Sequence, residues 1–161
     1  MGVEMGRSRP DYLVLVAAAL AACSAPEVTA DDGHAVRVAA VSEIVRKIAE
    51  NPGPIEAICV DFTNETAGES AIPGLDADLG LGDVELLPRA DCEEIGGVLQ
   101  KRGGGQAISV TPSTPALDGG NGARVQVLTS TGSRDVAAYA CTLRRDGDVW
   151  LVKQCELEAT T

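Results

Sequence analysis

The sequence predicts an α+β domain in which one N-terminal amphipathic helix packs on a mainly antiparallel, curled sheet of about four to six strands. Two observations lead to this fold class. Apolar residues recur at helical spacing between Val38 and Ile48, and four β-rich segments separated by turn residues fill the chain after Gln106. An apolar helix stripe and an apolar sheet face cover each other in the layers of an α+β domain.

The first segment of the chain is predicted to be a secretory signal. Arg7 and Arg9 precede an apolar run from Tyr12 to Ala22, and small residues follow it. Basic, apolar and small residues in that order are typical of such signals. As a helix, an apolar run of about eleven residues would span roughly 16 Å, too short for a hydrocarbon core of about 30 Å. We therefore expect a signal and not a membrane span.

The signal ends in Leu20-Ala21-Ala22-Cys23. This motif resembles the lipobox of bacterial lipoproteins, in which the cysteine thiol carries diacylglycerol and the signal is cut ahead of the cysteine. The resemblance implies a signal at residues 1–22, lipidation of Cys23 and a membrane anchor. Two or three acyl chains on one cysteine are enough for stable anchoring.

Ser24 follows the cysteine where some lipoproteins have Asp, and in this it resembles lipoproteins sent to the outer membrane of two-membraned bacteria. The expected location is therefore the outer membrane, facing the periplasm. Asp11 and Glu4 depart from the family's pattern. The alternatives are a plain signal cut after Ala25 or Ala30, or an uncleaved apolar stub on a cytosolic protein.

After the signal, the chain from Ser24 to Gly33 is polar and acidic without periodicity. Residues 23–34 are therefore predicted to form a flexible tether. The rest, residues 35–161, is long enough for one hydrophobic core and too short for two.

Charge and composition exclude several classes of partner. The chain has 13 Lys and Arg against 24 Asp and Glu, and its net charge of −11 is unchanged when the signal is removed. Nucleic acids and anionic lipid surfaces are bound through clustered Lys and Arg, so we expect neither as a partner. Phe62, Tyr139 and Trp150 are the only aromatic residues after the signal, which argues against stacking on bases or sugars.

The clearest helix of the chain has one apolar stripe and a defined end. The stripe is Val38, Val41, Ile44, Val45 and Ile48, and the other side has Arg37, Glu43, Arg46, Lys47 and Glu50. The sequence Asn51-Pro52-Gly53-Pro54 cannot continue a helix. We expect the stripe to face the core, with a partner-binding face as the alternative.

Shorter elements follow this helix. Strands are predicted at Ile55–Phe62 and Val84–Leu87, separated by a loop at Thr63–Gly82 that includes one helical turn near Leu75. Ala90–Lys101 is predicted as a brief helix interrupted by Gly96-Gly97, because acidic residues at its start favour the helix dipole.

The four later segments, 107–111, 123–131, 135–144 and 148–158, are predicted strands, and the last three should form an antiparallel meander. A two-residue turn at Asp146-Gly147 would pair Leu143 with Trp150 and Cys141 with Val152, all facing one core.

Four cysteines remain after Cys23: Cys59, Cys92, Cys141 and Cys155. An even number in an exported chain predicts two disulfides, for which three pairings exist. We favour Cys59 with Cys92 and Cys141 with Cys155, because each pair closes a local loop. The second bond requires a bulge or a longer turn, because the predicted register points Cys155 away from Cys141.

The sequence offers little of the chemistry of known active sites. The only histidine, His34, falls in the predicted tether, so no Ser-His-Asp or Cys-His arrangement can be assembled. The cysteine spacings lack the close pairs of zinc sites. We expect no catalytic residue, no cofactor and no metal site, although the many carboxylates leave acid–base chemistry open.

One acidic segment resembles the start of a calcium loop. It contains Asp76, Asp78, Asp83 and Glu85, but Leu81 and Leu87 stand where a glycine and a bidentate glutamate belong. We interpret it as an acidic surface loop.

One helix followed by an antiparallel sheet resembles the cystatin or nuclear-transport-factor-2 type of architecture, in which a curled sheet wraps a helix. The resemblance lies in element order alone, and such folds serve binders, inhibitors and some enzymes. The leading hypothesis is a membrane-anchored, non-enzymatic envelope lipoprotein that binds another protein. The alternatives are a small periplasmic enzyme or ligand carrier with a pocket between helix and sheet, and a tethered structural spacer.

Overall fold

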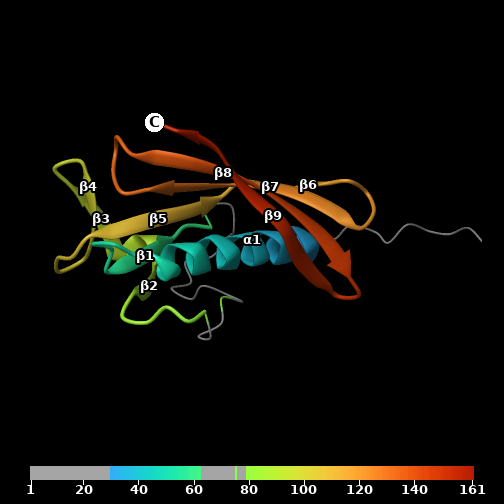
Figure 1. Cartoon of the computed structure of the whole chain (residues 1–161), viewed down its shortest axis with the longest axis horizontal. Helices are drawn as coiled ribbons and strands as arrows, with labels where there is room; N and C mark the ends of the chain where they lie inside the picture. Colours follow the sequence, from blue (N-terminus) through green and yellow to red (C-terminus); the bar gives the residue numbers. More distant parts are fainter. Residues whose placement is uncertain (1–29, 63–74, 76–78) are drawn as a thin grey trace, which may run out of the picture.

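The computed structural model of the chain describes residues 30–62, 75 and 79–161 (Figure 1). The predicted signal, the lipidation site Cys23 and most of the predicted loop from Thr63 to Gly82 lie outside these residues. In the described part, no helix is both long enough and apolar enough to cross a membrane.

The described residues form one long α-helix, one short 3-10 helix and nine strands. They are α1 (Ala30–Glu50), β1 (Ala57–Val60), β2 (Glu85–Pro88), η1 (Arg89–Asp91), β3 (Cys92–Ile95), β4 (Val98–Lys101), β5 (Ala107–Pro112), β6 (Ala116–Leu117), β7 (Gly122–Ser130), β8 (Val136–Asp146) and β9 (Val149–Thr160). The fold is α+β with a mostly antiparallel sheet, as predicted.

The main sheet has seven strands in the order β2-β1-β5-β7-β8-β9, with β6 paired to β7, and it does not close. This is more than the four to six strands expected. The sheet is also mixed, because β1 pairs in parallel with both β2 and β5. The helix α1 contacts β5, β7, β8 and β9, and so covers one face of the sheet (Figure 1).

The helix corrects two predictions. It begins at Ala30, so the final part of the predicted tether, including His34, is helical. Asp31 and Asp32 lie in its first turn, where carboxylates are favoured by the helix dipole. Its fully buried stripe includes Val36 and Ala40 instead of Val38, and Arg37, which was predicted to lie on the polar side, is buried.

The predicted helix at Ala90–Lys101 is wrong. This segment is instead the antiparallel hairpin β3–β4, which forms a separate two-stranded sheet. Gly96 and Gly97, the two residues of its turn, have φ of 63° and 85°. Two successive residues with positive φ suit the tight turn of a hairpin, and glycine adopts this conformation without strain.

The meander β7–β8–β9 is confirmed, but its last turn is shifted. Asp146 pairs with Val149 and Leu143 with Val152, so the turn residues are Gly147 and Asp148. The predicted pairs of Leu143 with Trp150 and Cys141 with Val152 are therefore wrong. A register shift between Thr142 and Leu143 places Cys141 opposite Cys155, which is the bulge that the predicted disulfide required.

The sheet has two halves that differ in how they are covered. In the covered half (β1, β2 and β5), Ile58 and Val60 join the core beneath α1, whereas Cys59 packs on the other side with Cys92 and Leu99 of the hairpin. In the open half (β7, β8 and β9), the residues of β7 alternate along the strand. Every second residue is buried on the side that faces α1, and the residues between them are exposed on the other side. We call the exposed side of β7, β8 and β9 the outer face.

Candidate binding surface

The hairpin β3–β4 is fixed to the sheet by a disulfide. Cys92, the first residue of β3, bonds Cys59 at the centre of β1, with Cα atoms 6.4 Å apart. Cys141 and Cys155 form the second disulfide across β8 and β9, with Cα atoms 4.1 Å apart. Both favoured pairings are formed, and the first attaches the base of the hairpin to a fully buried strand.

Backbone contacts fix the other end of the hairpin. The Leu99 amide donates to the Thr131 carbonyl at 2.7 Å, and the Ser133 amide donates to the Gly97 carbonyl at 3.3 Å. A Cβ atom on Gly132 would lie 1.9 Å from the Gly97 oxygen, so only glycine permits this approach. The turn of the hairpin is therefore docked against the loop between β7 and β8.

An ion-pair group lies beside the base of the hairpin. The Lys101 Nζ lies 3.0 Å from a Glu85 carboxylate oxygen and 3.6 Å from one of Glu56. The hydrogen bond that Lys101 donates to Glu85 is the main cause that raises the pKa of Lys101 above 10.5. The ion pair therefore contributes fully to the stability of the fold at pH values below 10.5, the ordinary pKa of lysine. This contribution is lost only as the pH rises through the raised pKa of Lys101.

The side of the hairpin that faces away from the sheet is apolar at its tip. Ile95 and Val98 pair directly across the two strands, yet their side chains are 52% and 41% exposed. Glu93 pairs with Gln100 on the same side. An exposed apolar pair on a hairpin held at both ends is a preorganised surface, which loses little conformational entropy on binding. The sequence analysis missed this surface because it assigned the segment to a helix.

The opposite end of the domain has a buried charged group. Asp32, in the first turn of α1, accepts from Trp150 Nε1 at 3.3 Å and lies 3.1 Å from Arg145 Nη1. The Arg145 guanidinium lies 5.9 Å from the centre of the Trp150 ring. These contacts join the start of α1 to the β8–β9 hairpin, and both lie at the same end of the molecule (Figure 1).

His34 packs within the domain. Its ring lies 5.9 Å from that of Phe62, and the Arg37 guanidinium lies 6.0 Å from the same Phe62 ring. The prediction that His34 belongs to a flexible tether is therefore wrong. All four cysteines in the described part of the chain are in disulfides. No described cysteine is therefore a free thiol that could pair with His34 in a Cys-His arrangement.

Asp61, directly after β1, is a described carboxyl group whose pKa is shifted. Partial burial raises its pKa above 3.8, and the Arg89 guanidinium opposes that rise. Arg89 also donates to the Cys92 carbonyl at 2.7 Å. Asp61 therefore lies beside the segment that leads into the hairpin.

Two hollows of the described surface have few titratable groups in their lining. One of about 260 Å³ lies between α1 and the sheet beside Tyr139, with Lys47 as its charged group and isoleucines around it. Another of about 420 Å³, along β6 and β7, has Asp118 and Arg124 in its lining. Among the described residues, no three metal-binding side chains lie close enough to hold an ion.

Comparison with known proteins adds no relative. No family model, curated protein or solved structure matches the chain. The resemblances to bacterial lipoproteins and to the cystatin or nuclear-transport-factor-2 architecture thus stay predictions.

Proposed function

We propose that this chain is an exported lipoprotein, held to the outer membrane by lipid on Cys23, whose domain is a non-enzymatic protein-binding module. The β3–β4 hairpin is its binding element. The observation that supports this proposal is the exposed pair Ile95 and Val98 on a hairpin that is fixed by the Cys59–Cys92 disulfide.

The bracing of the hairpin favours binding over spacing. A spacer needs length, whereas this hairpin has a disulfide at its base, a docked turn at its tip and ion pairs at its side. A few residues near the centre of an interface contribute most of the binding energy in protein complexes, and rigid groups lose less conformational entropy on binding.

The surroundings of the pair indicate the chemistry of the partner. Glu93 is exposed on the same side of the hairpin as Ile95. A partner with a shallow apolar pocket for Ile95 and Val98, and Lys or Arg at the rim of that pocket, would complement this surface.

The binding proposal is tested by photo-crosslinking from the hairpin. A photoreactive amino acid at Glu93 of the full chain should give one dominant adduct in membranes, because Glu93 lies beside the apolar pair. Ile95→Asp with Val98→Asp should remove most of that adduct, because it places charge in the predicted apolar contact. Val149→Asp is the matched control, since Val149 is 58% exposed at the other end of the domain. An adduct that persists in the hairpin variant, or disappears in the control, would refute the hairpin as the binding element.

The anchor is tested separately by intact mass of the membrane-extracted chain. We expect residues 1–22 to be absent, acyl chains on Cys23, and a mass gain of two hydrogens per disulfide on reduction of two disulfides. A chain that begins at Pro26 without lipid would show a plain secretory signal and overturn the anchor, while leaving the hairpin proposal standing.

A further inference from the structure

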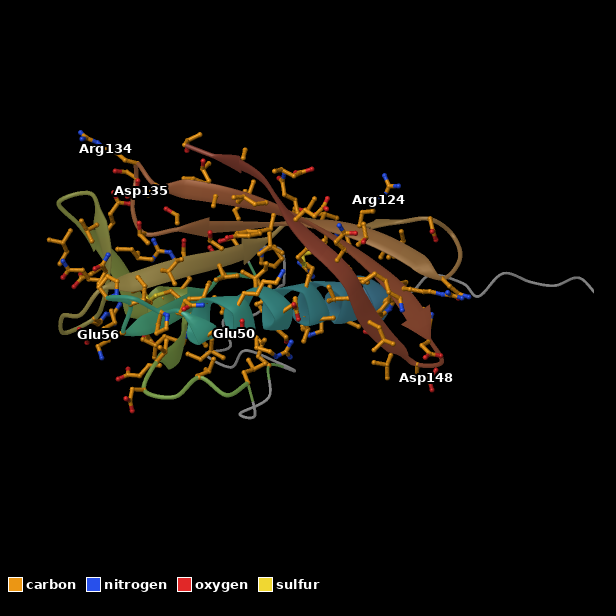
Figure 2. The ribbon with its side chains drawn as sticks, in the orientation of Figure 1. Glu50, Glu56, Arg124, Arg134, Asp135 and Asp148 are labelled. Atoms are coloured by element: carbon orange, nitrogen blue, oxygen red, sulfur yellow. A yellow bond between two sulfur atoms is a disulfide. The ribbon has the colours of Figure 1, made fainter. Side chains whose placement is uncertain are left out.

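Three basic residues on the outer face have no ion-pair partner among the described residues. Arg124 of β7, Arg144 of β8 and Lys153 of β9 are all exposed. Arg124 points away from α1 (Figure 2). Arg144 and Lys153 line a single hollow of about 240 Å³, and Arg145, Asp146 and the exposed Leu151 complete its lining. This is the basic half of the outer face.

Two glutamates lie on the same face, further from the β8–β9 turn. Glu156 is opposite Ala140, one row beyond the row of Thr142 and Gln154. Glu158 accepts from Gln126 Nε2 at 3.1 Å, which places it on the outer face as well. This is the acidic half of the outer face.

Small residues lie between and beside the two halves. The outward positions along β8 are Ala138, Ala140 and Thr142, which pair with Leu128, Gln126 and Arg124 of β7. Small side chains permit two sheets to approach to about 10 Å, the usual spacing of packed sheets.

We infer that two copies of this chain pack outer face to outer face, with their strands running in opposite directions. A twofold axis across the strands exchanges the two ends of each strand, so the basic half of one copy meets the acidic half of the other. A twofold axis along the strands would instead place like charges together. The charge pattern therefore selects one of the two arrangements, and the contact is isologous and closed.

The charge of the whole chain favours this face over others for self-association. The outer face balances Arg124, Arg144 and Lys153 against Asp146, Glu156 and Glu158, whereas the chain as a whole has a net charge of −11. Two copies that meet here therefore bring together faces with balanced charge, although each chain is strongly negative. The proposed lipid anchor would add to this by confining chains to one membrane and raising their effective concentration.

Charge exchange tests this dimer in the full, detergent-extracted chain by native mass spectrometry. The unaltered chain should appear as a dimer. Arg124→Glu with Arg144→Glu should be monomeric, and so should Glu156→Lys with Glu158→Lys, each with self-affinity lowered roughly 100-fold by like charges. An equimolar mixture of the two variants should restore a dimer with one copy of each, which a misfolded variant cannot do.

The control is Arg46→Glu with Arg134→Glu, which makes the same change in net charge on α1 and on the β7–β8 loop and should stay dimeric. A monomeric unaltered chain, a variant that dimerises alone, or a mixture of folded variants that stays monomeric would overturn the inference. The hairpin variant Ile95→Asp with Val98→Asp should dimerise normally, so failure of the dimer and failure of the hairpin proposal are distinguishable.

Discussion

The two halves of the main sheet differ in whether one or both of their faces are buried. In the covered half, β1 is buried on both sides, because α1 lies beneath it and the β3–β4 hairpin packs above it. In the open half, β7 alternates buried and exposed residues, and only the side toward α1 is covered. Figure 1 shows the hairpin at one end of the molecule and the β8–β9 turn at the other.

This difference separates two kinds of surface. A parallel strand buried on both faces is apolar at every position, as in Ala57–Val60, whereas a half-exposed strand can vary every second residue without loss of the core. The covered half therefore supports the hairpin, and the open half leaves the outer face available to a second copy.

The largest expected effect comes from the disulfide of the covered half. Replacing Cys59 and Cys92 together by Ala should lower the free energy of unfolding by about 4 kcal/mol, because the bond closes a long loop. The same change at Cys141 and Cys155 should cost about 3 kcal/mol, because their sequence separation is 14 against 33. Urea denaturation of both variants checks this. A larger loss in the Cys141 variant would show that the open half depends more on its disulfide.

Truncating one leucine on the side of each half that faces away from α1 compares how well the two halves are covered. Leu99→Ala should cost about 2–5 kcal/mol, because the Leu99 side chain is only 3% exposed where the hairpin packs on β1 and β5. Leu128→Ala on the outer face should cost less than about 1 kcal/mol, because Leu128 is 39% exposed. Both leucine variants should be denatured in a chain that also carries Arg124→Glu and Arg144→Glu. Because that chain is expected to be monomeric, the measured loss then reports folding and not self-association. Equal losses would remove the distinction between covered and open halves.

Asp32→Asn tests how the open half is joined to the helix. It leaves the Arg145 guanidinium without its carboxylate, and we expect a loss of about 1–3 kcal/mol. Fluorescence of Trp150, the only tryptophan, reports unfolding at this contact. Asp31→Asn is the matched control, because Asp31 is the exposed neighbour. If both variants unfold alike, the buried pair does not hold the two elements together.

The smallest expected effect is a pH dependence in the covered half. Because the pKa of Asp61 is raised, the folded chain holds that proton more tightly than the unfolded chain does. Its contribution to stability is therefore greatest at low pH and is lost as pH rises through the raised pKa. Asp61→Asn should slightly stabilise the domain at pH 7 and have no such effect near pH 3. A loss of stability at pH 7 would show that the attraction to Arg89 outweighs burial.

Sequence periodicity was enough to predict most elements of the open half. Val125 and Val127 alternate with polar residues, and Gly132 and Gly147 occur near the turns, so β7, β8 and β9 could be placed from local signals. The local signals did not fix the last turn, because Asp146-Gly147 and Gly147-Asp148 are both acceptable turn pairs.

The covered half was harder to predict because it depends on contacts between distant residues. The acids beside Cys92 suit a helix start as well as a strand, and only packing of Leu99 on β1 and β5 decides between the two. The two disulfides were predictable from loop length. The exposed pair Ile95 and Val98 was not, since exposure is a property of the folded hairpin.

Because α1 begins at Ala30, the tether between the proposed lipid anchor and the domain is shorter than predicted. If Cys23 carries lipid, six residues lie between it and Ala30, and the seven Cα-to-Cα steps reach at most about 25 Å even when fully extended. The domain would then stay close to the headgroups of its own bilayer and search that surface for partners in two dimensions.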